Sequence, residues 1–265
     1  MKTILLIGAG GGMGSACARM FLSRGDRVLG VDRPCAEMID GVIPLYADLT
    51  EPQQIEDAFL RARGQVESID AVVYAAGVYD ADSLVEIDDV RMRRIFDVNF
   101  FGAYRTIRAF LPIIRRDARI VFVTSELADL DPLPFTGLYG ITKATLDRYA
   151  FSLAMELQML GMRVSVLRPG AVETVLLDDS VSRIRSFTER TALYPNVAEK
   201  FLRVTNRVET KSVPPERVAK KIAKILSKKH PRFQYALNRN LLLRLYGVLP
   251  KRLKLFAIRT YLKTK

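Results

Sequence analysis

Residues 2–14 read KTILLIGAGGGMG in one-letter code, and this stretch decides the fold. An apolar run rich in β-branched residues leads directly into glycines, and residues 15–23 then have the pattern of a helix. A second apolar run at 27–31 ends in Asp32. Strand, glycine loop, helix and strand in this order predict a parallel α/β sheet. Glycines at that turn let the backbone approach a pyrophosphate, and the helix N-terminus supplies free N–H groups for it.

The rest of the chain repeats the alternation of strand and helix. Further strands are predicted at residues 42–46, 71–74, 119–124, 163–167 and 233–237, and helices at 52–62, 88–96, 101–114, 139–160 and 215–229. Right-handed crossovers then give a single-domain Rossmann fold over residues 1–240, with a doubly wound parallel sheet of about seven strands. Residues 174–211 break the rhythm, and we expect them to form a helical flap over a substrate pocket.

Composition excludes several classes of protein. Of 265 residues, 49% are apolar and 26% charged, which is ordinary for a globular chain and unlike a disordered one. The chain has one histidine, His230, which excludes a His-rich metal site, and no GxSxG motif for a serine nucleophile. We interpret His230 as a helix C-cap residue and Cys17 as core. The N-terminus does not resemble a secretory signal, so we expect a cytoplasmic protein.

Later motifs match those of one family in their order along the chain. They are Gly8-x-x-x-Gly12-x-Gly14, Ala47-Asp48-Leu49, Tyr74-Ala75-Ala76-Gly77, Asp97-Val98-Asn99, Thr124-Ser125, Tyr139-x-x-x-Lys143 and Pro169-Gly170-Ala171-Val172-Glu173-Thr174. Through them the chain resembles the classical short-chain dehydrogenase/reductase family, and in particular members related to hydroxysteroid and retinol dehydrogenases. The resemblance implies an NAD(P) site formed by Gly8, Gly12, Met13, Gly14, Asp32, Arg33, Asp48, Leu49, Ala75, Ala76, Gly77, Tyr139, Lys143, Pro169, Gly170, Val172 and Thr174.

Three positions depart from the family pattern. Ile7 stands where threonine is usual, and Ala75 replaces an asparagine in the turn. Tyr139 follows Ser125 by 14 positions, one more than is usual. This spacing leaves Glu126 as a neighbour that could take the place of Ser125.

Asp32 favours NAD as the cofactor. A carboxylate at the end of the second strand accepts hydrogen bonds from the ribose hydroxyls and repels a 2′-phosphate. Arg33 argues for NADP, because a guanidinium could bind that phosphate. We predict NAD, since the acid is retained and Gly11 does not supply the basic residue that other NADP members have in the loop.

Four residues form the predicted catalytic group. Tyr139 and Lys143 share one helix face, and a nearby ammonium would lower the phenol pKa from its ordinary value near 10. Tyr139 would then act as general base or acid, while Ser125 hydrogen-bonds the substrate oxygen. The resemblance implies that Asn99 helps to hold a water that links Lys143 to solvent. Hydride transfer to a nicotinamide needs no metal.

Apolar residues predict a lipophilic secondary alcohol or ketone as substrate. The candidates for the cleft are Leu127, Leu130, Leu133, Phe135, Leu138, Val175, Leu176, Leu177, Phe187 and Leu193. The rival interpretation is a regulator that senses the dinucleotide without catalysis. The sequence has no nucleic-acid-binding motif, so we expect no nucleic-acid partner.

The C-terminal part is strongly basic. Residues 200–265 hold 19 Lys and Arg against 2 Asp and Glu, whereas the first 199 residues hold 22 and 27. Residues 241–265 form an amphipathic basic extension, which Pro250 divides into two short helices. Such helices lie on an anionic membrane surface or pack on protein, and both interpretations remain open. The resemblance also suggests a homodimer or homotetramer paired through the helices at 101–114 and 139–160.

Overall fold

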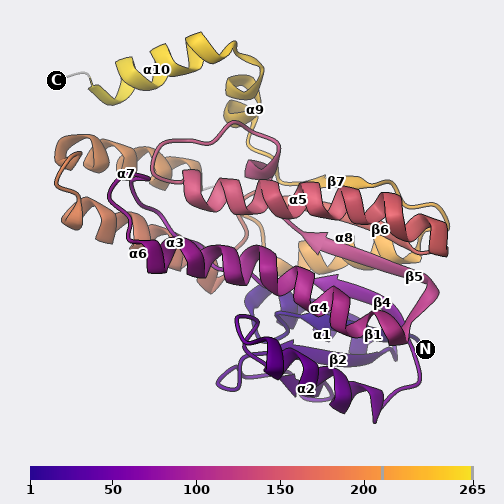
Figure 1. Cartoon of the computed structure of the whole chain (residues 1–265). Helices are drawn as coiled ribbons and strands as arrows, with labels where there is room; N and C mark the ends of the chain where they lie inside the picture. Colours follow the sequence, from indigo (N-terminus) through magenta and orange to yellow (C-terminus); the bar gives the residue numbers. More distant parts are fainter. Residues whose placement is uncertain (210–211, 264–265) are drawn as a thin grey trace.

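The computed structural model describes residues 1–209 and 212–263 (Figure 1). Its centre is one parallel seven-stranded sheet in the order β3-β2-β1-β4-β5-β6-β7. The strands are β1 (Thr3–Ile7), β2 (Arg27–Asp32), β3 (Ile43–Tyr46), β4 (Ile69–Tyr74), β5 (Ile114–Val123), β6 (Arg163–Pro169) and β7 (Gln234–Leu237). The strand order reverses between β1 and β4, and in such sheets ligands bind at the carboxyl ends beside that point.

Helices cover both faces of the sheet (Figure 1). One face carries α2 (Pro52–Arg63), α4 (Gly102–Phe110) and α5 (Gly137–Leu157), and the other carries α1 (Gly12–Leu22) and α8 (Pro215–Ser227). Helix α3 (Asp89–Phe96) runs through a short π-helical turn into α4. The doubly wound Rossmann arrangement predicted from the sequence is therefore confirmed.

Alternation along β1 explains the two layers. Successive side chains of a strand point to opposite faces, so Leu5 and Ile7 join the core beneath α2, α4 and α5. Ile4 and Leu6 join the second core beneath α1 and α8. All four side chains are at most 1% exposed, as a central strand of a doubly covered sheet requires. Cys17 lies in the second core, as predicted.

Helices α4 and α8 end earlier than predicted. Helix α4 stops at Phe110, because Pro112 has no N–H to continue the hydrogen-bond ladder, and Ile114 already belongs to β5. Helix α8 ends at Ser227 rather than at residue 229. The exposed His230 therefore lies beyond the helix and does not cap it.

The flap and the C-terminal extension are helical, as predicted. Helices α6 (Val175–Arg190) and α7 (Pro195–Glu209) form the described part of the flap, and residues 210–211 lie outside the described residues. Helices α9 (Leu241–Val248) and α10 (Lys251–Lys263) flank Pro250 at the end of the molecule near α6 and α7 (Figure 1). Within the described residues, every helix is too short or too polar to cross a bilayer.

Candidate active site

The glycine loop between β1 and α1 is shaped by close backbone contacts. Gly8 has a φ of +85°, and a Cβ there would lie 2.6 Å from the amide nitrogen of Ala76. A Cβ on Gly14 would lie 1.9 Å from the carbonyl oxygen of Gly8. Only glycine fits either position, so the loop packs tightly against the turn after β4. The first turn of α1 consequently faces the cleft at the end of the sheet.

Three adjoining cavities make up this cleft, with volumes of about 890, 400 and 510 Å³. The largest is bordered by Asp32 and Asp48, and the smallest by the glycine loop. Ala75 and Gly77 border all three, which makes the cavities one continuous cleft. Every residue predicted to bind the cofactor lines some part of it. The sequence therefore predicted which residues meet here, although their roles stay predictions.

The carboxylate of Asp32 is fixed by backbone donors. Its Oδ2 accepts a hydrogen bond from the Gly10 amide at 2.9 Å, and its Oδ1 accepts one from the Arg33 amide at 2.8 Å. The acid is thus held at the end of β2, inside the largest cavity. Asp48 lines the same cavity and accepts hydrogen bonds from the amide and hydroxyl of Thr50.

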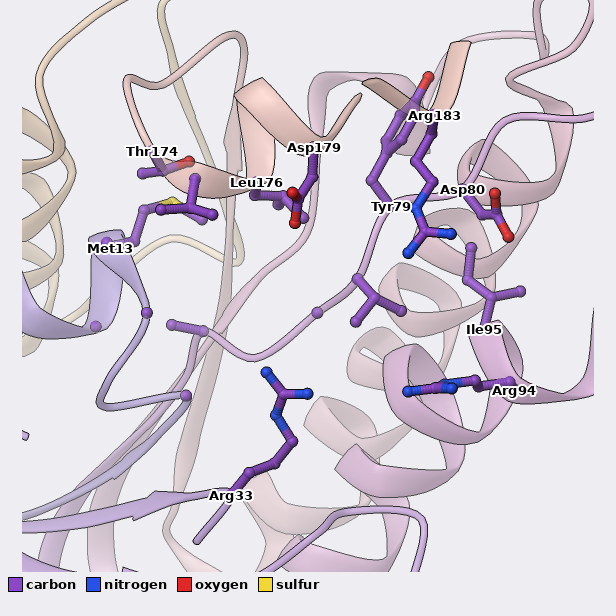
Figure 2. A pocket seen from close by; sticks show the side chains of 18 of the residues that line it. Met13, Arg33, Tyr79, Asp80, Arg94, Ile95, Thr174, Leu176, Asp179 and Arg183 are labelled. Carbon is purple, nitrogen blue, oxygen red and sulfur yellow. The ribbon is translucent and has the colours of Figure 1, made fainter. Parts of the chain in front are cut away.

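Arginines from three elements enter the smallest cavity. Figure 2 shows Arg33, Arg94 and Arg183 pointing into it, Arg33 from the loop directly after β2 and the other two from α3 and α6. Only Arg33 was predicted from the sequence. The positive side chains lie beside the N-terminal turn of α1, which itself attracts anions. This donor set and the size of the cleft suit the diphosphate of a dinucleotide.

Tyr139 and Lys143 lie on the buried side of α5. Their side chains border the 510 Å³ cavity, and the Lys143 Nζ is 5.8 Å from the centre of the Tyr139 ring. The ammonium also donates to the Val123 carbonyl at 3.5 Å. A Cβ at Gly77 would come within 2.8 Å of Nζ, so any side chain there would push the lysine ammonium from its present position.

Burial dominates the acid–base properties of this pair. It raises the pKa of Tyr139 to about 12, although a hydrogen bond with the Ser125 hydroxyl acts in the opposite direction. Burial also lowers the pKa of Lys143 to about 8. The expectation that the lysine depresses the phenol pKa is therefore wrong for this structure. The reason is that desolvation destabilises the phenolate and the ammonium alike.

Asn99 lies within the π-helical turn Asp97–Phe101 and is fully buried. Its Nδ2 donates to the Val78 carbonyl and to the Thr142 hydroxyl, both at 2.9 Å. Its Oδ1 accepts a hydrogen bond from the Val78 amide at 2.8 Å. π-Helical turns occur frequently at functional sites. Here the turn places one amide where it ties the loop after β4 to the helix that carries Tyr139.

Ser125, rather than Glu126, faces the phenol. The serine begins a short 3₁₀ turn, accepts a hydrogen bond from the Leu127 amide and hydrogen-bonds Tyr139. The Glu126 carboxylate instead accepts a hydrogen bond from the Asn240 amide at 2.8 Å. The loop between Ser125 and Tyr139 thus absorbs the extra residue without displacing the serine.

The 510 Å³ cavity beside Ser125 is largely apolar. Four residues predicted for a substrate cleft line it, namely Leu127, Leu133, Leu176 and Leu177. Val175 instead borders the other two cavities.

The remaining predicted residues lie elsewhere. Phe135 packs against Phe187 of the flap helix α6 with ring centres 4.7 Å apart, and Leu138 is core. Leu193 is 63% exposed, and Leu130 lies against Gly247 of α9.

Sequence reasoning missed cavity residues from the flap helix α7 and from the C-terminal extension. The cavity is also lined by Phe201 and Thr205 of α7, Leu242, Leu243 and Tyr246 of α9, and Tyr261 of α10. The amphipathic pattern of residues 241–262 was visible in the sequence, but nothing local to it indicated that it reaches Ser125 and Tyr139.

Comparison with known proteins identifies the family. Residues 2–184 match the family model described as short chain dehydrogenase. The chain belongs to the short-chain dehydrogenase family. It is accordingly an oxidoreductase with a Rossmann fold that binds NAD or NADP, as the sequence motifs suggested.

Relatives with different substrates resemble the chain. A 3-ketodihydrosphingosine reductase of Bacteroides thetaiotaomicron is 26% identical over 88% of this chain and 86% of its own length. Mouse estradiol 17-beta-dehydrogenase 2 is 30% identical over 65% of this chain and 49% of its own length. The aldohexose dehydrogenase of Thermoplasma acidophilum superposes with a TM-score of 0.75 at 19% identity, covering 94% of this chain and 96% of its own. That last likeness concerns the fold.

Proposed function

We propose that the protein transfers a hydride between NAD and a lipophilic secondary alcohol or ketone. The observation that carries the proposal is the juxtaposition of Ser125, Tyr139 and Lys143 at one apolar cavity, which adjoins the cofactor cleft. An acid–base group beside a hydrophobic pocket suits a substrate with one reactive oxygen on an apolar body.

The side chains would divide the proton chemistry among them. The nicotinamide supplies the hydride acceptor for oxidation or the donor for reduction. As phenolate, Tyr139 would take the proton of the alcohol during oxidation, and as phenol it would give a proton to the ketone oxygen during reduction. The Ser125 hydroxyl would hydrogen-bond that oxygen in both directions. A protonated Lys143 would offset part of the cost that burial imposes on the phenolate. Asn99 holds the loop after β4 and α5 in register, and the water-holding role suggested by the resemblance belongs to the proposal.

The substrate class is supported by the lining and by the relatives. A reductase of a long-chain keto base and a dehydrogenase of a steroid both act on one oxygen carried by a large apolar body. The cavity of about 510 Å³ offers volume for the reactive end of such a molecule. Leu133, Leu176 and Leu242 would contact its hydrocarbon part.

NAD is the proposed cofactor because Asp32 is held in place as a carboxylate acceptor. Two backbone amides fix its oxygens at the end of β2, where a ribose would meet them. Arg33 and Arg94 border the same cavity and favour NADP. The ratio of kcat/KM for NAD to that for NADP decides the question, and a ratio below one overturns the NAD assignment.

A substrate panel tests the activity. NADH formation or loss at 340 nm would be followed with 3-ketodihydrosphingosine, estradiol, estrone, long-chain secondary alcohols and, as a polar comparison, glucose. Turnover of a lipophilic compound, with kcat/KM well above that of glucose, is the expected result. Cofactor binding by calorimetry without turnover of any compound would instead favour a dinucleotide-sensing regulator.

We also propose a homo-oligomer formed through α4 and α5. Phe101, which immediately precedes α4, and Tyr104, Phe151 and Met155 on the two helices are each 40–48% exposed, which leaves apolar surface to cover. Light scattering at a mass of 29.9 kDa would refute this assembly.

A further inference from the structure

The C-terminal helices are fastened to the loop that follows β5. Three acids of that loop hold them: Asp131 pairs with Lys254 at 2.6 Å, Asp129 pairs with Arg239, and Glu126 accepts from the Asn240 amide. We call these three contacts the acid clamp. The Lys254 side chain is only 8% exposed, so this end of α10 has a defined inner face. Ile258 and Leu262 continue that face and join the core under the flap.

The acid clamp fixes which side chains face outward. Leu241, Leu245 and Val248 of α9 and Leu253, Leu255 and Phe256 of α10 are all more than half exposed, up to 80% for Val248. We call these six residues the docking face. Single exposed apolar residues are ordinary, but a group of this size within two adjoining helices marks an interaction surface.

Basic side chains accompany the docking face. Arg244, Lys251, Arg252 and Arg259 are exposed on the same two helices. The sequence has no acid after Glu216, so acidic side chains within the extension do not offset these charges. Apolar and cationic groups side by side fit a surface that offers hydrocarbon and negative charge together.

That combination favours a membrane over a second copy of the chain. A two-fold dimer through this face would bring the same patch against itself and oppose four cations with four more. An anionic lipid surface attracts the cations and accepts the leucines at the headgroup boundary. Helix α9 has 8 residues and α10 has 13, too few to span a bilayer of about 30 Å. We propose that α9 and α10 dock the enzyme peripherally on anionic membranes.

Docking would place the substrate cavity at the membrane. Leu242, Leu243 and Tyr246 belong to α9, and they line the cavity that contains Ser125 and Tyr139. The side of α9 next to the docking face is therefore a wall of the cavity. A lipophilic substrate could enter from the bilayer without crossing water; this consequence rests on the proposed function, whereas membrane docking does not.

Vesicle co-sedimentation tests the docking. The full chain is mixed at low salt with vesicles of phosphatidylglycerol and phosphatidylcholine, and with vesicles of phosphatidylcholine alone. We expect binding to the anionic vesicles to be stronger by about tenfold or more, and to weaken as salt rises. The double variant Val248→Asp/Phe256→Asp should lose at least about tenfold in affinity, because two carboxylates replace side chains that enter the interface.

A matched control is Leu60→Asp on α2, which adds an acid at an apolar residue 54% exposed, far from α9 and α10 (Figure 1). Its vesicle binding should equal that of the unaltered protein. Absence of binding to anionic vesicles, or equal loss in Leu60→Asp, overturns the proposal. It is also overturned if light scattering shows a dimer that Val248→Asp/Phe256→Asp dissociates, because a second copy then covers the docking face. Since binding is measured without turnover, an inactive enzyme that still binds vesicles would refute only the proposed function.

Discussion

The two sides of the cleft are built in different ways. The cofactor side is shaped by backbone: Gly8 and Gly14 pack at distances that no side chain allows, and amides fix the carboxylate of Asp32. The substrate side is shaped by side chains from many separate segments, including α9 and α10 at the far end of the chain. The backbone contacts lie at one edge of the sheet, between the glycine loop and the turn after the paired strand β4, whereas the side-chain walls depend on how distant elements pack.

This difference decides how each side tolerates change. On the cofactor side, a Cβ added at Gly8 or Gly14 would collide with backbone atoms. Substitution of either glycine should therefore abolish cofactor binding. On the substrate side, Leu242 and Tyr246 contact the cavity from a helix held by the acid clamp. Changes in the clamp should alter substrate affinity while cofactor affinity is preserved. Four predictions test this contrast, in order of decreasing expected effect.

The largest effect should come from Tyr139→Phe. Removing the hydroxyl removes the proton donor and acceptor, so kcat should fall by about 10³-fold or more. NAD binding, measured by calorimetry, should stay within about twofold because the ring remains in place. Tyr79→Phe is the matched control, since its ring lies 4.9 Å from that of Tyr139 in the same cavity. Turnover near the normal rate in Tyr139→Phe would contradict the mechanism.

Asp32→Asn tests the cofactor side alone. The amide cannot repel a 2′-phosphate, and Arg33 remains beside it, so the preference for NAD over NADP should fall about 10- to 100-fold. The ratio of the two kcat/KM values is the readout. Asp48→Asn, in the same cavity, should change both values alike and leave the ratio unaltered. An unchanged ratio in Asp32→Asn would show that Asp32 does not select the cofactor.

How much of the site could be predicted follows from the same contrast. The alternation of strands and helices, the glycine loop and the grouping of Ser125, Tyr139 and Lys143 were predicted, because each depends on local pattern and spacing. The pKa of Tyr139 was predicted in the wrong direction, because spacing gives the neighbour of a group and not its burial. Arg183 and Tyr261 were missed, since they reach the cleft from the flap and the extension, where no motif marks them.

Lys143→Met should stabilise the protein while it removes activity. The pKa of Lys143 is lowered from 10.5 to about 8 by burial, so holding its charge costs folding free energy. Below pH 8 the lysine is charged in both states and the full cost is present. Between pH 8 and 10.5 the unfolded state holds the extra proton, so stability rises with pH. Above pH 10.5 the lysine is neutral in both states, so this cost in folding free energy is absent.

The gain in Lys143→Met should therefore depend on pH. At pH 7 the free energy of unfolding of the variant should exceed that of the parent by something on the order of 2 kcal/mol. Above pH 10.5 the charge of Lys143 should no longer contribute to the difference between the two free energies. Urea unfolding at several pH values measures the difference. A variant less stable than the parent at pH 7 would mean that the lysine contributes more through its hydrogen bond to Val123 than its burial costs.

The smallest effect should come from Asp131→Asn in the acid clamp. Its carboxylate is the acid that pairs with Lys254, whose ammonium also donates to the Gly247 carbonyl at 2.7 Å and lies over the Tyr246 ring. Losing the negative charge leaves the buried ammonium of Lys254 poorly compensated, so α9 and α10 should loosen. Because α9 forms a wall of the substrate cavity, KM for a lipophilic substrate should rise about two- to fivefold with kcat nearly unchanged. The KM for NAD should not change, since the clamp is remote from Asp32 and the glycine loop.

Asp117→Asn, an exposed acid paired with Arg115 on β5, is the matched control and should alter neither constant. A rise in both KM values in Asp131→Asn would show that the two sides of the cleft are coupled, and the distinction between them would fail.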